Sequence, residues 1–191
     1  MNIGLTGGIG AGKSLVSKIL VSMSYPVFNS DAEAKKIVEK NPVIRANIIK
    51  ILGKKAYTAE GYNRPYVASI VFNDNEKLEQ LNAIIHPAVR QAFKEFSIKH
   101  AGELVFNEAA ILFETGAYKT FDKTILVVAD EEIRLKRVLD RDKSSKEEIQ
   151  ARFSKQWNDN QKMKLADFTI DNNEKESVLL QIEAILKSLN S

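Results

Sequence analysis

Residues 7–14 have the types and the spacing of a phosphate-binding loop. They read Gly-Gly-Ile-Gly-Ala-Gly-Lys-Ser, which satisfies the pattern G-x-x-x-x-G-K-[ST]. An apolar stretch precedes them and a helical pattern follows, and the motif requires this strand-loop-helix context. Glycines let successive backbone N–H groups converge on phosphate oxygens, and the helix that follows points its positive dipole end at them. The sequence therefore predicts a site for a phosphorylated ligand.

The side chains at the end of this loop extend the predicted chemistry. Lys13 can reach the β and γ oxygens of a nucleotide, and Ser14 is expected to ligate magnesium. The predicted nucleotide-binding residues of the loop are Gly8, Gly10, Ala11, Gly12, Lys13, Ser14 and Leu15.

Phosphoryl transfer also needs a carboxylate that orients or deprotonates the acceptor hydroxyl. Asp31 follows the second predicted strand, so we expect it at the carboxyl edge of the sheet, where open α/β sheets bind ligands. Its alternative role is the N-cap of a helix that begins near Ala32, and one side chain can fill both roles.

Two further acids follow the third predicted strand. Glu108 stands where a phosphate-loop protein often keeps an acid near its magnesium through water, and a solvated loop acid is an equally good interpretation. Glu114 comes six residues later and by itself has the pattern of a surface acid.

Arginines concentrate in the last third of the chain. Arg137 and Arg141 are four residues apart and share a face if their helix continues that far. A planar guanidinium suits phosphate contact, and the alternative is a solvated basic face paired with Asp140 and Asp142. The other basic residues of this stretch are Arg134, Lys136, Lys143, Lys146 and Arg152.

Two other polar residues, His86 and Asn172, are candidates for the site. His86 precedes Pro87, which predicts an extended conformation at a helix start, and a lone histidine there is usually structural. Asn172, in the turn after the last predicted strand, could read an adenine edge with its amide or simply turn the chain.

The elements that must position these residues alternate between strands and helices. The predicted strands are Asn2–Leu5, Val27–Phe28, Leu104–Phe106, Thr124–Val128 and Phe168–Ile170. Several are apolar on consecutive residues, as buried parallel strands are, so we predict an α/β doubly wound sheet.

Two long excursions interrupt the alternation. Residues 32–102 are expected to form a helical insertion, with helical spacing at 44–52, 78–85 and 89–96 and a loop at 61–65. Residues 137–165 form the second excursion, where Ser144 or Ser145 offers a capping box for a helix that carries Ile149, Phe153 and Trp157. Both are expected to be insertions on one domain, 1–191.

Composition limits the class of protein. The chain has 191 residues, 44% of them apolar, which suffices for one sizeable core. A net charge of +3 is too even for a general nucleic-acid or membrane binder. The absence of cysteine excludes a disulfide framework and a Cys-ligated zinc site. No leader or membrane span is evident, so we expect a cytoplasmic protein. We also expect a monomer that binds neither nucleic acid nor membrane.

Taken together, the motifs resemble the dephospho-CoA kinase family, which belongs to the nucleoside-monophosphate-kinase-like P-loop proteins. The resemblance covers nearly the whole chain. It is carried by residues 5–14, Asp31-Ala32, Gly61, Arg64, Val71-Phe72, Leu81-Asn82, Ile85-His86-Pro87, Ile111–Glu114, Phe121-Asp122, Val127-Val128, Arg137, Arg141, Gln156, Ala166-Asp167 and Ile170–Asn172.

The resemblance implies ATP- and magnesium-dependent phosphorylation of the ribose 3′-hydroxyl of dephospho-CoA, on a five-stranded P-loop core with a helical acceptor-binding insertion at 32–102 and a lid at 137–165. It implies that Asp31 faces the acceptor hydroxyl and that Arg137 and Arg141 belong to the lid side of the ATP site, with Arg141 and Lys13 catalytic. Arg64 and His86 would lie in the acceptor-binding part.

Three departures from the family pattern bear on this interpretation. Asn29 stands where the family usually has an aspartate, so the catalytic role falls on Asp31 alone. Leu15 replaces a common threonine, and Ala110 stands where proline is usual. None of these removes a part that phosphoryl transfer requires.

Two other functions remain possible on the sequence. One is another small-molecule or nucleotide kinase of the same architecture, which only acceptor assays would separate. The other is a nucleotide-binding switch, which usually carries an Asp-x-x-Gly second motif. Here Asn107-Glu108 has no following glycine, which argues against a switch.

Overall fold

The computed structural model of the chain describes residues 1–142 and 144–190. These residues form two compact units, one made of Met1–Phe28 with the chain from His100 onward, the other of Asn29–Lys99. Lys143, one of the basic residues noted above, lies outside the described residues. Among the described helices, none combines the length and the apolar character needed to cross a bilayer.

A five-stranded sheet with the order β2-β5-β1-β6-β7 is the centre of the first unit. The pairs β1–β5, β1–β6 and β6–β7 are parallel. This confirms the predicted doubly wound α/β sheet, and each of the five predicted strands is present. Their bounds are β1 Asn2–Gly7, β2 Val27–Asn29, β5 Val105–Glu108, β6 Lys123–Val128 and β7 Phe168–Asp171.

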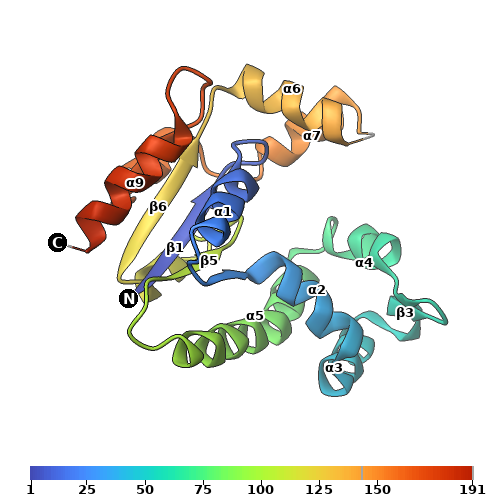
Figure 1. The fold of residues 1–191 in the computed structure, drawn as a ribbon. Helices are drawn as coiled ribbons and strands as arrows, with labels where there is room; N and C mark the ends of the chain where they lie inside the picture. The colour runs from blue at the N-terminus through green and yellow to red at the C-terminus, as the bar shows by residue number, and fades with distance from the viewer. Residues whose placement is uncertain (143, 191) are drawn as a thin grey trace. The chain divides into compact units, whose positions relative to one another are not determined.

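Helices connect these strands, and two of them lie beyond the carboxyl end of β6, where Figure 1 shows α6 and α7. The helical elements of this unit are α1 Lys13–Ser22, η2 Ala117–Thr120, α6 Glu131–Arg141, α7 Lys146–Phe153, α8 Asp159–Met163 and α9 Val178–Leu189.

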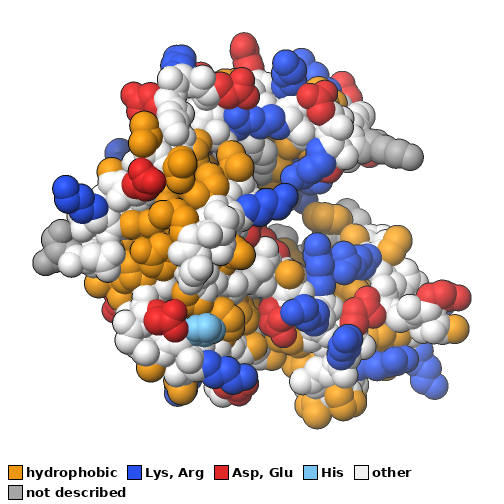
Figure 2. Space-filling model, viewed as in Figure 1, with side chains coloured by type: hydrophobic (Ala, Val, Ile, Leu, Met, Phe, Trp, Pro, Cys, Tyr) orange, Lys and Arg blue, Asp and Glu red, His pale blue; other side chains and the backbone are white. Residues whose placement is uncertain are grey.

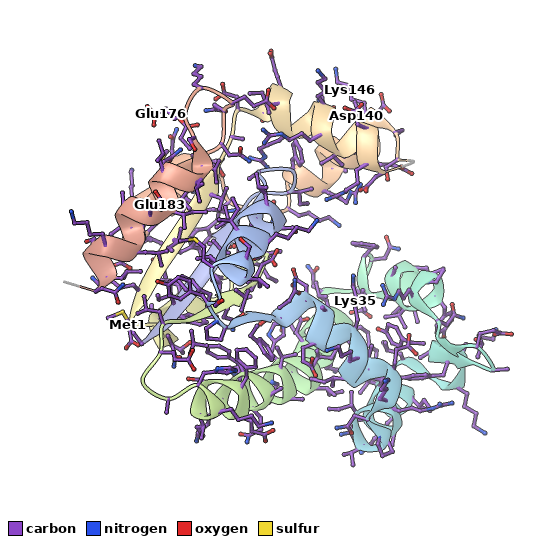
Figure 3. All side chains as sticks on the ribbon, in the orientation of Figure 1. Met1, Lys35, Asp140, Lys146, Glu176 and Glu183 are labelled. Carbon is purple, nitrogen blue, oxygen red and sulfur yellow. The ribbon has the colours of Figure 1, made fainter. Side chains whose placement is uncertain are left out.

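The core of this unit joins α1 and α9 to the sheet. Consecutive residues of β5 and β6 are buried, as expected for parallel strands covered on both faces. The fully buried side chains of this core include Ile3, Leu5, Val16, Phe106, Val127 and Ile170. Apolar side chains also gather on the surface over α9 and β6 in Figure 2, and the exposed ones on α9 include Leu179 and Leu180. Charged groups such as Glu183, Asp140 and Lys146 point away from the ribbon (Figure 3).

The second unit is helical, with one short hairpin. Its elements are α2 Ser30–Lys40, α3 Pro42–Leu52, η1 Lys54–Ala56, β3 Tyr57–Thr58, β4 Gly61–Tyr62, α4 Arg64–Val71 and α5 Asn75–Lys99. A separate apolar cluster stabilises it, centred on Ile48, Val67 and Leu81. Residues 61–65 are therefore not a plain loop as predicted, because β4 and the start of α4 lie within them.

The N-cap of α2 corrects one alternative left open for Asp31. The helix begins at Ser30, and its N-cap is Asn29, whose side-chain oxygen accepts a hydrogen bond of 2.7 Å from the backbone N–H of Ala32. Asp31 lies inside the first turn. The capping role belongs to Asn29, and since Asn caps a helix about as well as Asp, the replacement of the usual aspartate costs the helix little.

Pro87 does not begin a helix, contrary to the prediction. It lies inside α5, so His86 is helical and the two predicted segments form one 25-residue helix. Proline inside a helix removes one backbone hydrogen bond. Apolar residues on both sides of it, Leu81, Ile85 and Ala88, pack into the second core, and this burial outweighs the lost bond.

The capped helix of the second excursion is shorter than predicted. Ser145 is its N-cap and forms a complete capping box with Glu148. The helix ends at Phe153, so Ile149 and Phe153 belong to it and Trp157 does not.

His86 gives a pH-dependent test of the second unit. Burial and, secondarily, Arg90 lower the pKa of His86 below its usual value. The unfolded chain therefore binds more protons than the folded one just below about pH 6.5, and stability should fall as the pH falls through this range. We expect wild type to lose more unfolding free energy than His86→Gln between about pH 7.5 and about pH 5.5 in urea titrations. Parallel losses in the two proteins would contradict the prediction.

Candidate active site

The phosphate-binding loop links β1 to α1 and contains two residues whose backbone conformation favours glycine. Gly10 has φ 80° and Gly12 has φ 105°, both in the left-handed region. The helix α1 begins at Lys13, directly after Gly12. The first N–H groups of an α-helix have no intrahelical partner, so this end of α1 can donate hydrogen bonds to an anion.

The ammonium group of Lys13 lies against the loop. Its Nζ donates a hydrogen bond of 2.7 Å to the carbonyl oxygen of Gly7 and a longer one of 3.5 Å to that of Gly8. A positive charge thus lies against the backbone of the phosphate loop.

Ser14 and Glu108 come together although 94 residues separate them. Ser14 Oγ donates to Glu108 Oε1 at 3.2 Å, and Ser17 Oγ donates to Glu108 Oε2 at 2.8 Å. Glu108 is buried at the end of β5, beside Leu5 of β1 in the parallel register. This arrangement of hard oxygen atoms is of the kind that magnesium prefers.

Asn172 is buried behind the loop. Its Nδ2 donates a hydrogen bond of 2.8 Å to the carbonyl oxygen of Ala11. The same residue closely approaches the backbone at Gly12, where a side-chain carbon would overlap the Asn172 amide. The amide that the sequence offered to an adenine edge therefore contacts the loop backbone in this structure.

Arg137 lies next to Asn172. Its Nη2 donates to the carbonyl oxygen of Asn172 and to Glu174 Oε1, both at 3.0 Å. Arg141, one helical turn later, instead pairs with its neighbour Asp142 at 2.8 Å, and its side chain is 65% exposed. That hydrogen bond raises the pKa of Arg141 and lowers the pKa of Asp142. The two arginines predicted to act together thus have different partners.

A third arginine, which the sequence did not single out, contacts the loop directly. Arg134 Nε donates a hydrogen bond of 2.9 Å to the carbonyl oxygen of Ile9. On the other side of that residue, the backbone N–H of Ile9 donates to Gln156 Oε1 at 2.9 Å. The sequence showed a concentration of arginines in this stretch, and it showed Gln156 only as one of the residues that carry the family resemblance.

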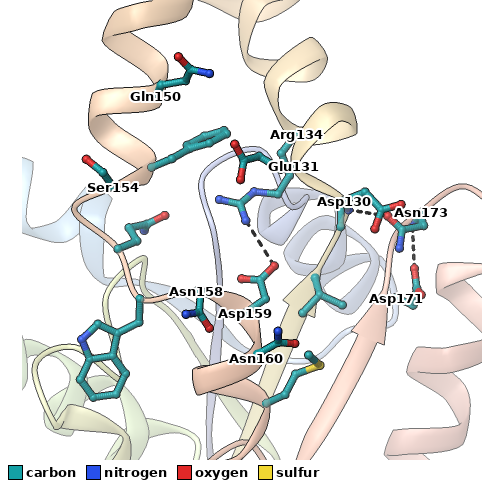
Figure 4. Close-up of a pocket in the computed structure, with 16 residues that line it drawn as sticks. Asp130, Glu131, Arg134, Gln150, Ser154, Asn158, Asp159, Asn160, Asp171 and Asn173 are labelled. Atoms are coloured by element: carbon teal, nitrogen blue, oxygen red, sulfur yellow. Dashed lines mark hydrogen bonds and ion pairs between the residues drawn. The ribbon is translucent and has the colours of Figure 1, made fainter.

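Arg134 also lines a cleft of about 740 Å³, which lies between α6, α7, α8 and the ends of β6 and β7. Figure 4 shows the guanidinium of Arg134 pointing toward Asp159, with which it forms an ion pair of 3.3 Å. At the opposite wall, the backbone N–H of Asp130 donates to Asn173 Oδ1 at 2.6 Å.

Glu114 is not the surface acid that the sequence suggested. Its Oε1 lies 2.9 Å from Nζ of Lys162, which is fully buried, and it also accepts a hydrogen bond of 3.1 Å from the backbone N–H of Trp157. This ion pair connects the loop after β5 to α8 and to the linker that precedes α8.

Three predicted residues belong to the second unit. Asp31 lies in the first turn of α2, two residues after the end of β2. Arg64 is the first residue of α4, and His86 lies in α5.

Comparisons with known proteins cover nearly the whole chain. The sequence model of the family described as dephospho-CoA kinase (CoaE) matches residues 1–177. A dephospho-CoA kinase from Bacteroides fragilis is 36% identical over 190 residues, which are 99% of this chain and 93% of that protein.

Two solved structures are also similar. The protein TT1252 from Thermus thermophilus has a TM-score of 0.89 and 33% identity, with 100% of this chain and 98% of that chain covered. The dephospho-CoA kinase from Campylobacter jejuni has a TM-score of 0.72 and 27% identity, with coverage of 98% and 96%.

The buried ion pair predicts an asymmetric response to mutation. Glu114→Leu would leave the ammonium of Lys162 buried without its partner, so we expect a loss of about 3–5 kcal/mol in the free energy of unfolding. Adding Lys162→Met should restore most of that loss, since two apolar side chains can replace a buried pair.

Urea denaturation measures both effects. The matched control is Lys123→Met, which breaks the half-exposed Lys123–Asp167 pair and should cost at most about 1 kcal/mol. A cost for Glu114→Leu no larger than that of the control would contradict the prediction.

Proposed function

The chain belongs to the dephospho-CoA kinase family, and on this premise we propose that it transfers the γ-phosphoryl group of ATP to the ribose 3′-hydroxyl of dephospho-CoA, giving coenzyme A and ADP. The observation that carries the proposal is the complete phosphate loop at 7–14 with Lys13 against it and the buried Glu108 beside Ser14.

Binding of the triphosphate would use the backbone N–H groups of the loop and of the first turn of α1. Lys13 would place its charge on the β and γ oxygens, where negative charge develops as the phosphoryl group moves. Because this charge is already held at the loop by Gly7, little reorganisation is needed when the substrate arrives.

Magnesium fits the oxygen atoms of Ser14 and Glu108. These two residues would hold it, Ser14 directly and Glu108 through water, and the ion would supply charge neutralisation between the β- and γ-phosphates. The pair of serines on Glu108 keeps its carboxylate oriented toward this position.

Asp31 would act on the acceptor. In the transfer, the 3′-oxygen forms a bond to the γ-phosphorus while the bond from that phosphorus to the β–γ bridging oxygen breaks, and the hydroxyl proton passes to the Asp31 carboxylate. Because Asn29 supplies the N-cap of α2, Asp31 is not needed for capping.

The remaining predicted residues divide between the two substrates. Arg137, Arg141 and Asn172 would serve the ATP side, with Asn172 acting through the backbone of Ala11. Arg64 and His86, in the helical unit 29–99, would serve the acceptor side. We also propose a cytoplasmic monomer that binds neither nucleic acid nor membrane, and the even balance of charges supports the second part of this proposal.

A conservative substitution tests the role of Asp31. Asp31→Asn keeps the shape but removes the base, so we expect kcat to fall by about 10²- to 10⁴-fold with little change in melting temperature. The matched control is Glu33→Gln, which changes a second carboxylate in the first turn of α2 and should leave kcat near wild type. Equal kcat values for the two variants in steady-state kinetics would refute the general-base role.

Acceptor truncation tests the function as a whole. Dephospho-CoA offers an adenosine, a pyrophosphate and a pantetheine arm, and binding energy from the remote arm should appear as catalysis. We therefore expect kcat/KM to fall steeply for AMP, CMP and shikimate compared with dephospho-CoA, measured as ADP release at saturating ATP and magnesium. Phosphorus NMR of the product should locate the new phosphate on the 3′-oxygen. A smaller acceptor that is turned over equally well would point to another kinase of the same architecture.

A further inference from the structure

We propose that Gln156 and Arg134 are positioning residues for phosphoryl transfer, because together they hold the backbone of Ile9 at the tip of the phosphate loop in the conformation that receives the nucleotide. This inference deepens the proposed function and rests on it for the identity of the reaction. It assigns to neither residue a contact with substrate.

The geometry centres on a single residue. The N–H of Ile9 donates to Gln156 Oε1 and its carbonyl oxygen accepts from Arg134 Nε, each at 2.9 Å. Ile9 lies between Gly8 and Gly10, and each of these glycines lacks a side chain that could restrict its backbone. Two side chains from distant parts of the chain therefore fix both polar groups of the peptide backbone at the tip.

The loop needs such restraint for a physical reason. An ordered glycine loses more conformational entropy than any other residue, so a loop with four glycines is costly to hold in one conformation. N–H groups converge on a phosphate only if the carbonyl groups between them point elsewhere. Here those of Gly7, Ile9 and Ala11 accept hydrogen bonds from Lys13, Arg134 and Asn172.

Close packing of α6 against the loop strengthens the same constraint. A side-chain carbon built on Gly8 would lie 2.5 Å from Nη2 of Arg134, and one on Gly10 would lie 2.6 Å from the backbone oxygen of Arg134. Both distances are too short for a real side chain. At Gly10 the neighbour is backbone, so the packing of α6 requires a glycine there, whereas a side chain at Gly8 would displace the guanidinium of Arg134 from its contact with the loop.

Arg134 is itself held in place on its other sides. Its guanidinium carbon lies 4.5 Å from the ring centre of Phe153, its Nη1 pairs with Asp159, and the residue is only 9% exposed. A guanidinium with these contacts acts through the loop backbone, whereas the exposed Arg141 can move.

Gln156 is fixed through a second set of contacts. Its Nε2 donates to the carbonyl oxygen of Ala110 at 3.3 Å. The next residue, Trp157, donates its backbone N–H to Glu114, which is paired with the buried Lys162. The Glu114–Lys162 pair thus holds the α7–α8 linker in the position from which Gln156 reaches Ile9.

These contacts tie α6 and the linker after α7 to one residue of the phosphate loop. Arg134 lies in α6, before α7, and Gln156 lies after α7. Loss of either contact should therefore weaken nucleotide binding without changing the helical unit 29–99, which is proposed to bind the acceptor.

Calorimetric titration of the full-length protein with magnesium-ADP, without acceptor, tests the proposal. We expect Gln156→Met to raise Kd for magnesium-ADP and KM for ATP by about tenfold, equivalent to about 1.4 kcal/mol. The melting temperature and KM for dephospho-CoA should stay close to wild type. The Lys123→Met variant, which breaks an ion pair at the start of β6, is the matched control and should leave Kd unchanged.

A double-mutant cycle tests whether the two residues share their anchor. If both act on Ile9, the Kd of Arg134→Met/Gln156→Met should rise by less than the product of the two single effects. Arg134→Met could fail to fold because it leaves the carboxylate of Asp159 without its partner. In that case the variant Arg134→Met/Asp159→Asn, which removes this charge, takes the place of Arg134→Met in the cycle.

The outcomes separate this proposal from the proposed function. Three results would each overturn the positioning role. The first is an unchanged Kd in Gln156→Met, and the second is a rise in Kd that only follows a lowered melting temperature. The third is a Kd of the double variant equal to the product of the two single effects. Failure of the dephospho-CoA assignment would appear instead in the acceptor panel and would leave the nucleotide titrations unaffected.

Discussion

A phosphate loop works only if the N–H groups that bind the ligand face it while the carbonyl groups between them face the protein. In this chain side chains from several parts of the first unit contribute to that orientation. Lys13, Arg134 and Asn172 donate hydrogen bonds to carbonyl groups of the loop, and they come from three separate parts of the chain. The sheet matters because it brings the ends of β1, β5 and β7 together at this loop.

The charged side chains around the loop differ in how deeply they are buried. Glu108 is buried and bound to two serine hydroxyl groups, so its carboxylate is fixed next to Ser14. The Glu114–Lys162 pair is also buried, and a buried pair is better evidence for a fixed geometry than for added stability. Arg141, by contrast, is exposed and pairs with its neighbour Asp142.

The sequence alone determined the fold class, the phosphate loop and the family. These inferences succeed because they depend on local spacing: a loop motif between a strand and a helix, consecutive apolar residues in each strand, and a clear apolar stripe in α9. Local signals failed where distant packing decides the outcome. Pro87 was expected to begin a helix, yet burial of Leu81 and Ile85 carries α5 through it.

Only the tertiary structure decided which polar side chains face the loop. Glu114 looks like a surface acid in sequence because its partner, Lys162, lies 48 residues away, and hydrogen bonds between residues so distant leave no periodic signal. Arg134 was one of several arginines in its stretch and Gln156 entered only through the family resemblance, so the sequence predicted neither contact with Ile9. The capping of α2 by Asn29 in place of Asp31 was decided by a difference of two residues in where the helix begins, which sequence patterns do not resolve. Spacing thus determines the elements, whereas contacts between elements determine the roles of individual side chains.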